Sequence, residues 1–160
     1  MRSANTDPER QPMQALRRSP AARATRHASR AGATFARFVR NLAATGGYTL
    51  REAERHAVAV IATLEERLPI REVCNLEAQL PSRLDELLAF VPVNGLPAMD
   101  RTQFIERVAA RADVTHVQAE TIARTVFTFL RSQISEGEVH RVEARLPDSL
   151  RELWREPGLW

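Results

Sequence analysis

The sequence predicts an all-α protein built from two tandem copies of one helical unit. Alanine, leucine, arginine and glutamate dominate its 160 residues, with only six glycines and one tyrosine, a composition that favours helix over sheet. A shift of 66 residues aligns 38–90 with 104–156 without a gap, and 18 of the 53 aligned positions are identical. We therefore expect the two copies to pack as one helical domain around an approximate two-fold axis.

The expected organisation is an arm, two repeats and a connection between them. Residues 1–33 lack apolar periodicity and are predicted to be a disordered arginine-rich arm. Repeat one spans 34–90 and repeat two spans 101–157, and a lone copy of about 55 residues would be marginally stable. The linker 91–100, with two prolines and Asn-Gly, ends at Asp100, the expected N-cap of the next helix.

Each repeat opens with a short helix followed by a longer one. The first has an apolar face, which consists of Phe35, Phe38, Val39 and Leu42 in repeat one and of Phe104, Ile105 and Val108 in repeat two. Gly46-Gly47 is expected to end the first helix of repeat one. The longer helix begins at a predicted capping box, Thr49 with Glu52 and Thr115 with Gln118.

Two further short helices meet at a proline in each repeat. The stretches "EVCNLEAQLPSRLDEL" at 72–87 and "EVHRVEARLPDSLREL" at 138–153 share an apolar edge at i, i+3 and i+7. Pro81 and Pro147 follow that edge, and because proline suits the first turn of a helix, each "LP" pair predicts a corner. Beyond the corners the last helices place apolar residues on one side, namely Leu84, Leu87, Leu88, Leu150, Leu153 and Trp154.

These repeated stretches resemble bacterial domain-of-unknown-function family 2267. The resemblance covers about residues 34–156 and is carried by the "AQLP" and "ARLP" corners and by "GEVHRVEARLP". It implies an all-helical cytosolic protein for which no activity is established, so no catalytic residue follows from it. The arm lies outside the family pattern.

Two glutamates stand inside the apolar edges of the repeated stretches. Glu77 and Glu143 occupy equivalent positions, and a carboxylate there needs a partner. We expect each to accept hydrogen bonds from a helix start or from an arginine. A pair of catalytic acids is the alternative interpretation.

Other candidate chemistry in the sequence is sparse. Cys74 and His140 are equivalent positions, but two residues complete neither a zinc site nor a nucleophilic centre, and a surface pair is expected. His56, one turn after Glu52, is expected to be a solvated helix residue. We find no phosphate-binding glycine loop, nucleophile elbow or His-Glu-x-x-His motif, so no enzyme, cofactor or metal is predicted.

Positive charge concentrates in the arm. Residues 1–40 carry nine arginines against two acids, whereas 41–160 carry fourteen arginines against eighteen acids. The arm's candidate nucleic-acid contacts are Arg2, Arg10, Arg17, Arg18, Arg23, Arg26 and Arg30. Its lack of aromatic residues provides no stacking platform. A solubilising tail, a start site assigned too far upstream, an organellar transit peptide and contact with an acidic protein or membrane surface are the alternatives.

The single cysteine and the absence of an apolar run near 20 residues predict a cytoplasmic protein with no membrane span. The leading functional hypothesis is a non-catalytic interaction or scaffold module whose repeats offer a groove or face to a protein partner or to a second copy. The alternative is a nucleic-acid-associated protein that grips phosphate through its arm. An enzyme built on the repeated glutamates is the third class.

Overall fold

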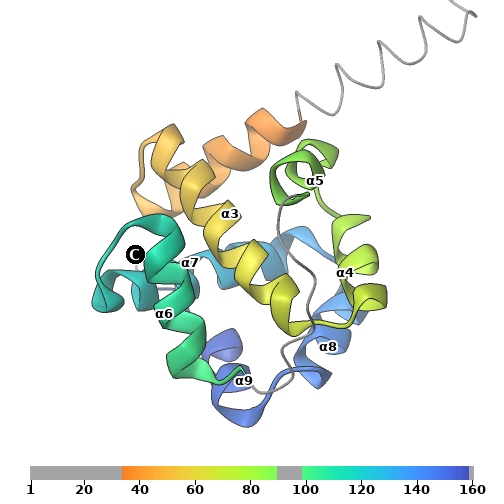
Figure 1. The fold of residues 1–160 in the computed structure, drawn as a ribbon. Helices are drawn as coiled ribbons and strands as arrows, with labels where there is room; N and C mark the ends of the chain where they lie inside the picture. Colours follow the sequence, from red (N-terminus) through yellow and green to blue (C-terminus); the bar gives the residue numbers. More distant parts are fainter. Residues whose placement is uncertain (1–33, 90–98, 159–160) are drawn as a thin grey trace, which may run out of the picture.

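The computed structural model is all-helical over the residues that it describes, 34–89 and 99–158. A helix over residues 34–46 comes first. In chain order the elements that follow are α3 (Leu50–Arg67), α4 (Ile70–Glu77), α5 (Ser82–Leu88), α6 (Arg101–Ala112), α7 (His116–Gln133), α8 (Glu136–Ala144) and α9 (Asp148–Arg155) (Figure 1). The predicted fold class is confirmed. The predicted arm and most of the linker lie outside the described residues.

Side-chain caps begin the main helices where the sequence predicts them. The backbone N–H of Thr49 donates to Glu52 Oε2 at 2.8 Å, and the Glu52 N–H donates to Thr49 Oγ1 at 3.2 Å. Thr115 and Gln118 form the same box at the start of α7. Asp100 caps α6, as expected, and is reinforced by Gln103. Each box satisfies amide donors that a helix N-terminus leaves free.

The turn after the first helix depends on both of its glycines. Gly47 has a φ of 67°, the left-handed conformation that glycine adopts at low cost. A Cβ on Gly46 would lie within van der Waals overlap of the Tyr48 ring. This close approach lets Tyr48 fold back and make an edge contact with His56, with ring centroids 4.5 Å apart.

The two "LP" corners form as predicted. Pro81 and Pro147 directly precede α5 and α9, with extended backbone ψ values of 130° and 160°. Neither proline has an amide hydrogen to leave unpaired at the helix start. The corners turn the short helices so that Leu84, Leu150 and Trp154 are buried.

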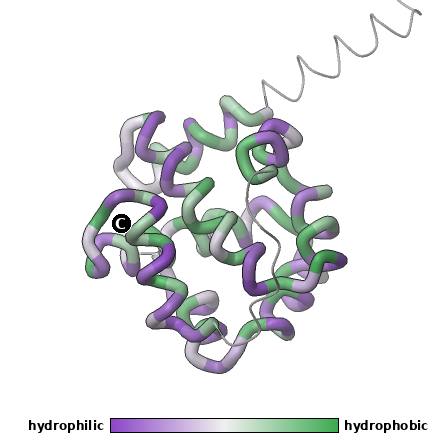
Figure 2. The backbone as a smooth tube through the Cα atoms, in the orientation of Figure 1, coloured by the Kyte–Doolittle hydropathy of each residue, from purple (hydrophilic) through white to green (hydrophobic). Residues whose placement is uncertain are grey.

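Helices from both repeats enclose one hydrophobic core. The two long helices α3 and α7 pack against each other, and α6 packs against both (Figure 1). Hydrophobic and hydrophilic residues alternate along the helices, as amphipathic packing requires (Figure 2). The six residues expected in a shared core belong to one buried cluster: Phe38, Leu64, Leu80, Phe104, Leu130 and Leu146. That shared core is confirmed, while the two-fold relation between the repeats stays a prediction.

Polar contacts also join the repeats. Glu66 on α3 is buried and accepts hydrogen bonds from Arg107, at 3.0 Å, and from Arg111, both on α6. Gln79 Oε1 accepts from the backbone N–H of Ser135 at 2.7 Å. Because one partner of each contact belongs to each repeat, these bonds fix the repeats relative to each other.

Candidate functional site

An open groove of about 1200 Å³ lies along the face of α3. Its lining comes from the 34–46 helix, α3 and α5, with one residue from α6. We call it the arginine-rimmed groove, and its lining residues are Phe35, Ala36, Val39, Arg40, Leu50, Arg51, Glu54, Arg55, Val58, Ala59, Ala62, Arg83, Leu87 and Arg111.

The floor of the groove is apolar. Phe35 and Val39 come from the 34–46 helix, Val58 from α3 and Leu87 from α5, so three helices contribute to one surface. Leu50 stands at the edge and is 56% exposed. Phe35 and Val39 are buried, whereas Val58 and Leu87 are half-buried. The described residues therefore leave part of the apolar floor uncovered.

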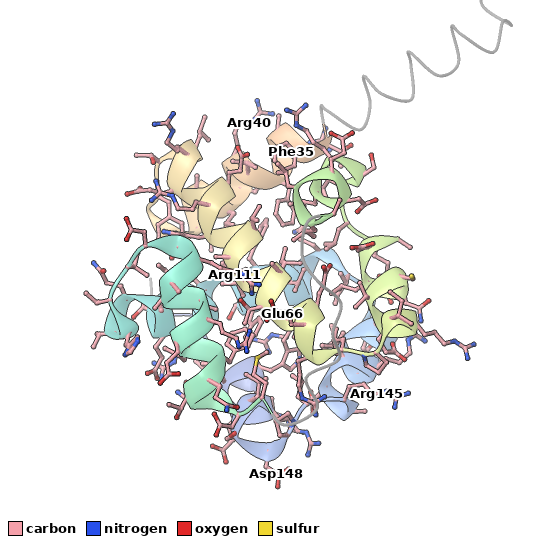
Figure 3. The ribbon with its side chains drawn as sticks, in the orientation of Figure 1. Phe35, Arg40, Glu66, Arg111, Arg145 and Asp148 are labelled. Carbon is pink, nitrogen blue, oxygen red and sulfur yellow. The ribbon has the colours of Figure 1, made fainter. Side chains whose placement is uncertain are left out.

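Arginines surround this floor. The lining holds five arginines and one glutamate, a net formal charge of +4, whereas the described residues as a whole carry sixteen arginines against eighteen acids. Arg83 lies over the Phe35 ring at 5.7 Å from its centroid, and Arg111 is bonded to Glu66 and Thr63. Phe35 and Arg40 belong to the 34–46 helix, and Arg111 lies near Glu66 (Figure 3).

Three of the rim arginines make no ion pair with a described residue. Arg40, Arg51 and Arg55 are exposed, and none has an ion-pair partner within the described ranges 34–89 and 99–158. Their positive field is therefore available to a ligand.

Repeat two has a corresponding but much smaller concavity, of about 250 Å³. We call it the second depression, and its lining residues are Arg101, Thr102, Ile105, Glu106, His116, Val117 and Glu120. Each of these stands 66 positions after a residue of the arginine-rimmed groove. The same part of each repeat thus forms a concavity. The two concavities differ in the side chains at equivalent positions.

An ion-pair network in repeat two includes Arg101 and Glu120 from the lining of the second depression. Arg101 stands where repeat one has Phe35, and Arg124 stands where it has Val58. Arg101 donates to Glu120 Oε1 and to Glu156 Oε1, each at 2.6 Å. Arg124 is paired with the same two glutamates, at 2.8 Å to Glu120 and 2.5 Å to Glu156.

The residues that follow α9 also contact this part of repeat two. We call residues 156–158 the C-terminal segment. The Gly158 N–H donates to Thr128 Oγ1 at 2.9 Å, and Thr128 stands where the groove of repeat one has Ala62. Hydrogen bonding to Arg101 lowers the pKa of Glu156, which keeps this carboxylate charged between the arginines.

A second cluster contains three carboxyl groups, Glu65 on α3, Glu77 on α4 and Asp85 on α5. Glu65 is 1% exposed, and burial together with the neighbouring Glu77 charge raises its pKa to about 8. Burial also raises the pKa values of Glu77 and Asp85. The protonated Glu65 donates a hydrogen bond to Glu77, so the cluster is stable at neutral pH because it holds a proton.

Glu77 and Glu143 are expected from the sequence to have equivalent hydrogen-bond partners, and this expectation is wrong. Glu143 pairs with an arginine as expected, accepting from Arg155 Nε at 2.8 Å. Glu77 instead bonds to Glu65. The physical reason lies in the sequence, because Ala89 stands in repeat one where repeat two has Arg155.

The histidine and cysteine candidates divide between core and surface. His56 is buried against Tyr48, and burial lowers its pKa, so the expectation of a solvated helix histidine is wrong. Cys74 and His140 are both exposed, in agreement with the expected surface pair. Within the described part of the chain, no three His, Cys, Asp or Glu side chains are arranged to hold a metal ion.

Two further sequence hypotheses concern nucleic-acid binding by the arm and the absence of a membrane span. The candidate nucleic-acid contacts Arg2 to Arg30 lie outside the described residues, so binding through the arm stays a prediction. In the described helices, none combines the length and the apolar character that crossing a bilayer would demand.

Sequence reasoning missed the arginine-rimmed groove. Its residues come from four helices, and their convergence depends on packing that periodicity does not report. A signal was nevertheless present in the positions where the repeats differ. Arginine in repeat two replaces Phe35, Val58, Glu65, Asp85 and Ala89 of repeat one, and these replacements mark both the groove and the carboxyl cluster.

Fold and site together define a small helical protein of two sequence-related repeats. Repeat one forms most of the open arginine-rimmed groove, and repeat two forms the smaller second depression next to an ion-pair network. The family comparison agrees with this description. The chain belongs to the DUF2267 family, described as an uncharacterized conserved protein, whose model matches residues 35–153. A search of curated proteins finds no match to the chain.

Proposed function

We propose that this protein is a non-catalytic protein-interaction module and that the arginine-rimmed groove is its docking surface. The observation that carries the proposal is the apolar floor, to which three helices contribute in an open groove of about 1200 Å³. Grooves of this kind receive an amphipathic helix through apolar anchors spaced one helical turn apart. Contiguous apolar surface that stays open on a soluble domain commonly marks an interaction site.

The composition of the groove supports a binding role over a catalytic one. Among the described residues, Glu54 is the only ionisable residue of the lining apart from its arginines, and none of the described lining residues is a serine, cysteine, threonine or histidine. A nucleophile with its base, or an acid with its base, would need at least one further such group. The bacterial cytoplasm is the location we predict for this module.

Site-specific photo-crosslinking of the intact protein in its own cells tests the proposal. A photoreactive residue replaces Leu50, at the groove edge, or Ile70, a matched exposed apolar residue on α4, with exposures of 56% and 61%. We expect a discrete protein adduct from position 50 and none from position 70. No adduct from position 50, or the same adducts from both positions, would remove the groove as a docking surface.

A further inference from the structure

We infer that the arginine-rimmed groove binds an acidic amphipathic segment of a partner protein, and that the C-terminal segment on the second depression shows how such a segment is held. The inference deepens the proposed function and rests on it. It commits to the partner's chemistry, namely carboxylates that face the rim and apolar side chains that face the floor.

The second depression supplies the internal example. There a glutamate that follows α9, Glu156, lies between Arg101 and Arg124, and the backbone of the C-terminal segment bonds to Thr128. These partners stand at positions equivalent to Phe35, Val58 and Ala62 of the groove. This region of the fold therefore accepts an extended acidic segment when arginines are present to pair with it.

The groove carries its arginines at other positions, on its rim, and the described residues place no acidic segment against them. Phe90 stands where repeat two has Glu156, so repeat one has no carboxylate at the equivalent position. The rim carries +4 on a body whose described residues carry a net charge of −2. Charge complementarity therefore selects an anionic occupant, and the apolar floor selects one with hydrophobic side chains.

The chain's own arm has the wrong sign for this role. Residues 1–33 hold seven arginines against Asp7 and Glu9, so the rim would repel them. Nucleic acid has the right sign, but its phosphates would leave the floor of Phe35, Val58 and Leu87 without a contact. A protein segment satisfies both the rim and the floor.

Binding to synthetic peptides tests the inference on the intact protein. The probe is a fluorescein-labelled 16-residue helical peptide with leucines at i, i+3, i+4 and i+7 and glutamates on its other face. Its comparisons are a charge-reversed peptide with lysine for glutamate and a scrambled acidic peptide of the same composition. Fluorescence anisotropy should show the acidic amphipathic peptide binding at least tenfold more tightly than either.

The rim arginines are tested individually. Arg40→Ala, Arg51→Ala and Arg55→Ala should each weaken binding of the acidic peptide by about two- to fivefold, as exposed ion pairs do. Arg37→Ala and Arg71→Ala are matched controls, since both residues are exposed arginines that do not line the groove. The controls should bind as the wild type does.

Several results would overturn the inference. The peptide, variant and dimerisation results leave the proposed function standing, whereas displacement by a phosphate polyanion would overturn both. Equal binding of the lysine peptide, or unchanged binding by the rim variants, would show that the partner is not selected by acid. Equal binding of the scrambled peptide would show that the groove does not need an apolar face on its partner. Duplex DNA or anionic vesicles that displace the peptide through the rim arginines would replace the protein partner by a phosphate polyanion, and rim-dependent dimerisation would put a second copy in the groove.

Discussion

Raising the pH should destabilise this protein because its carboxyl cluster folds around a proton. Glu65 has a folded pKa of about 8, against 4.5 for an ordinary glutamate. Between those values the folded state holds a proton that the unfolded chain releases, so stability is fully present below pH 4.5 and is lost as the pH rises through 8. His56, whose pKa is lowered by burial, acts in the opposite direction below pH 6.5, so the measurement belongs above that pH.

The expected loss of unfolding free energy follows from the part of the Glu65 titration that lies above pH 6.5. From pH 6.5 to about 8 the folded state keeps its extra proton over roughly 1.5 pH units, which corresponds to about 2 kcal/mol of unfolding free energy. With a urea dependence of about 1–3 kcal/mol per molar, the urea midpoint should fall by roughly 0.7–2 M. The assay is urea unfolding followed by circular dichroism at half-unit steps from pH 6.5 to 9.

A substitution assigns the effect to this side chain. Glu65→Gln removes the titrating group while keeping a donor for Glu77, so the variant should lose most of the pH slope and exceed the wild type in stability at pH 9. Glu152→Gln, at an exposed position of repeat two, is the control and should follow the wild type. A wild-type stability that is flat or rises from pH 6.5 to 8.5 would refute the reasoning.

Two further variants test the caps and the contacts between the repeats. Thr115→Ala should cost about 1 kcal/mol of unfolding free energy because it opens the capping box of α7, whereas Thr115→Ser keeps the hydroxyl and should cost less; equal costs for both would contradict the role of the cap. Glu66→Gln should cost roughly 1–3 kcal/mol, because it weakens the bonds to Arg107 and Arg111 across α3 and α6. Its control is Glu106→Gln on the exposed face of α6, and a loss as large in the control would exclude the bridge as the cause.

Local features of the fold were predictable because neighbours in sequence determine them. The boxes at Thr49 and Thr115 need only residues three positions apart, and the corners at Pro81 and Pro147 need only the ring of proline. The shared core followed from the apolar spacing of two repeats, each of which would be marginally stable in isolation. Each of these depends on periodicity or on one turn of chain.

Features that join distant helices were not predictable in the same way. Glu77 and Glu143 look alike in sequence, yet their partners are set by the helix that packs beside them, where Ala89 differs from Arg155. His56 seemed solvated because its helical neighbours are polar, but the Gly46-Gly47 turn returns Tyr48 to cover it. The groove needed the packed arrangement of four helices.

Under the proposed function, tethering accounts for the different sizes of the two concavities. The C-terminal segment is joined to α9, so it meets the second depression at an effective concentration in the millimolar range. A separate partner present at about 1 μM lacks this advantage, a difference of about 4 kcal/mol. Burial of roughly 160 Å² of apolar surface would supply that amount. The apolar floor would thus hold the proposed partner, which is free in solution, whereas the tethered C-terminal segment is held by two arginines and a threonine.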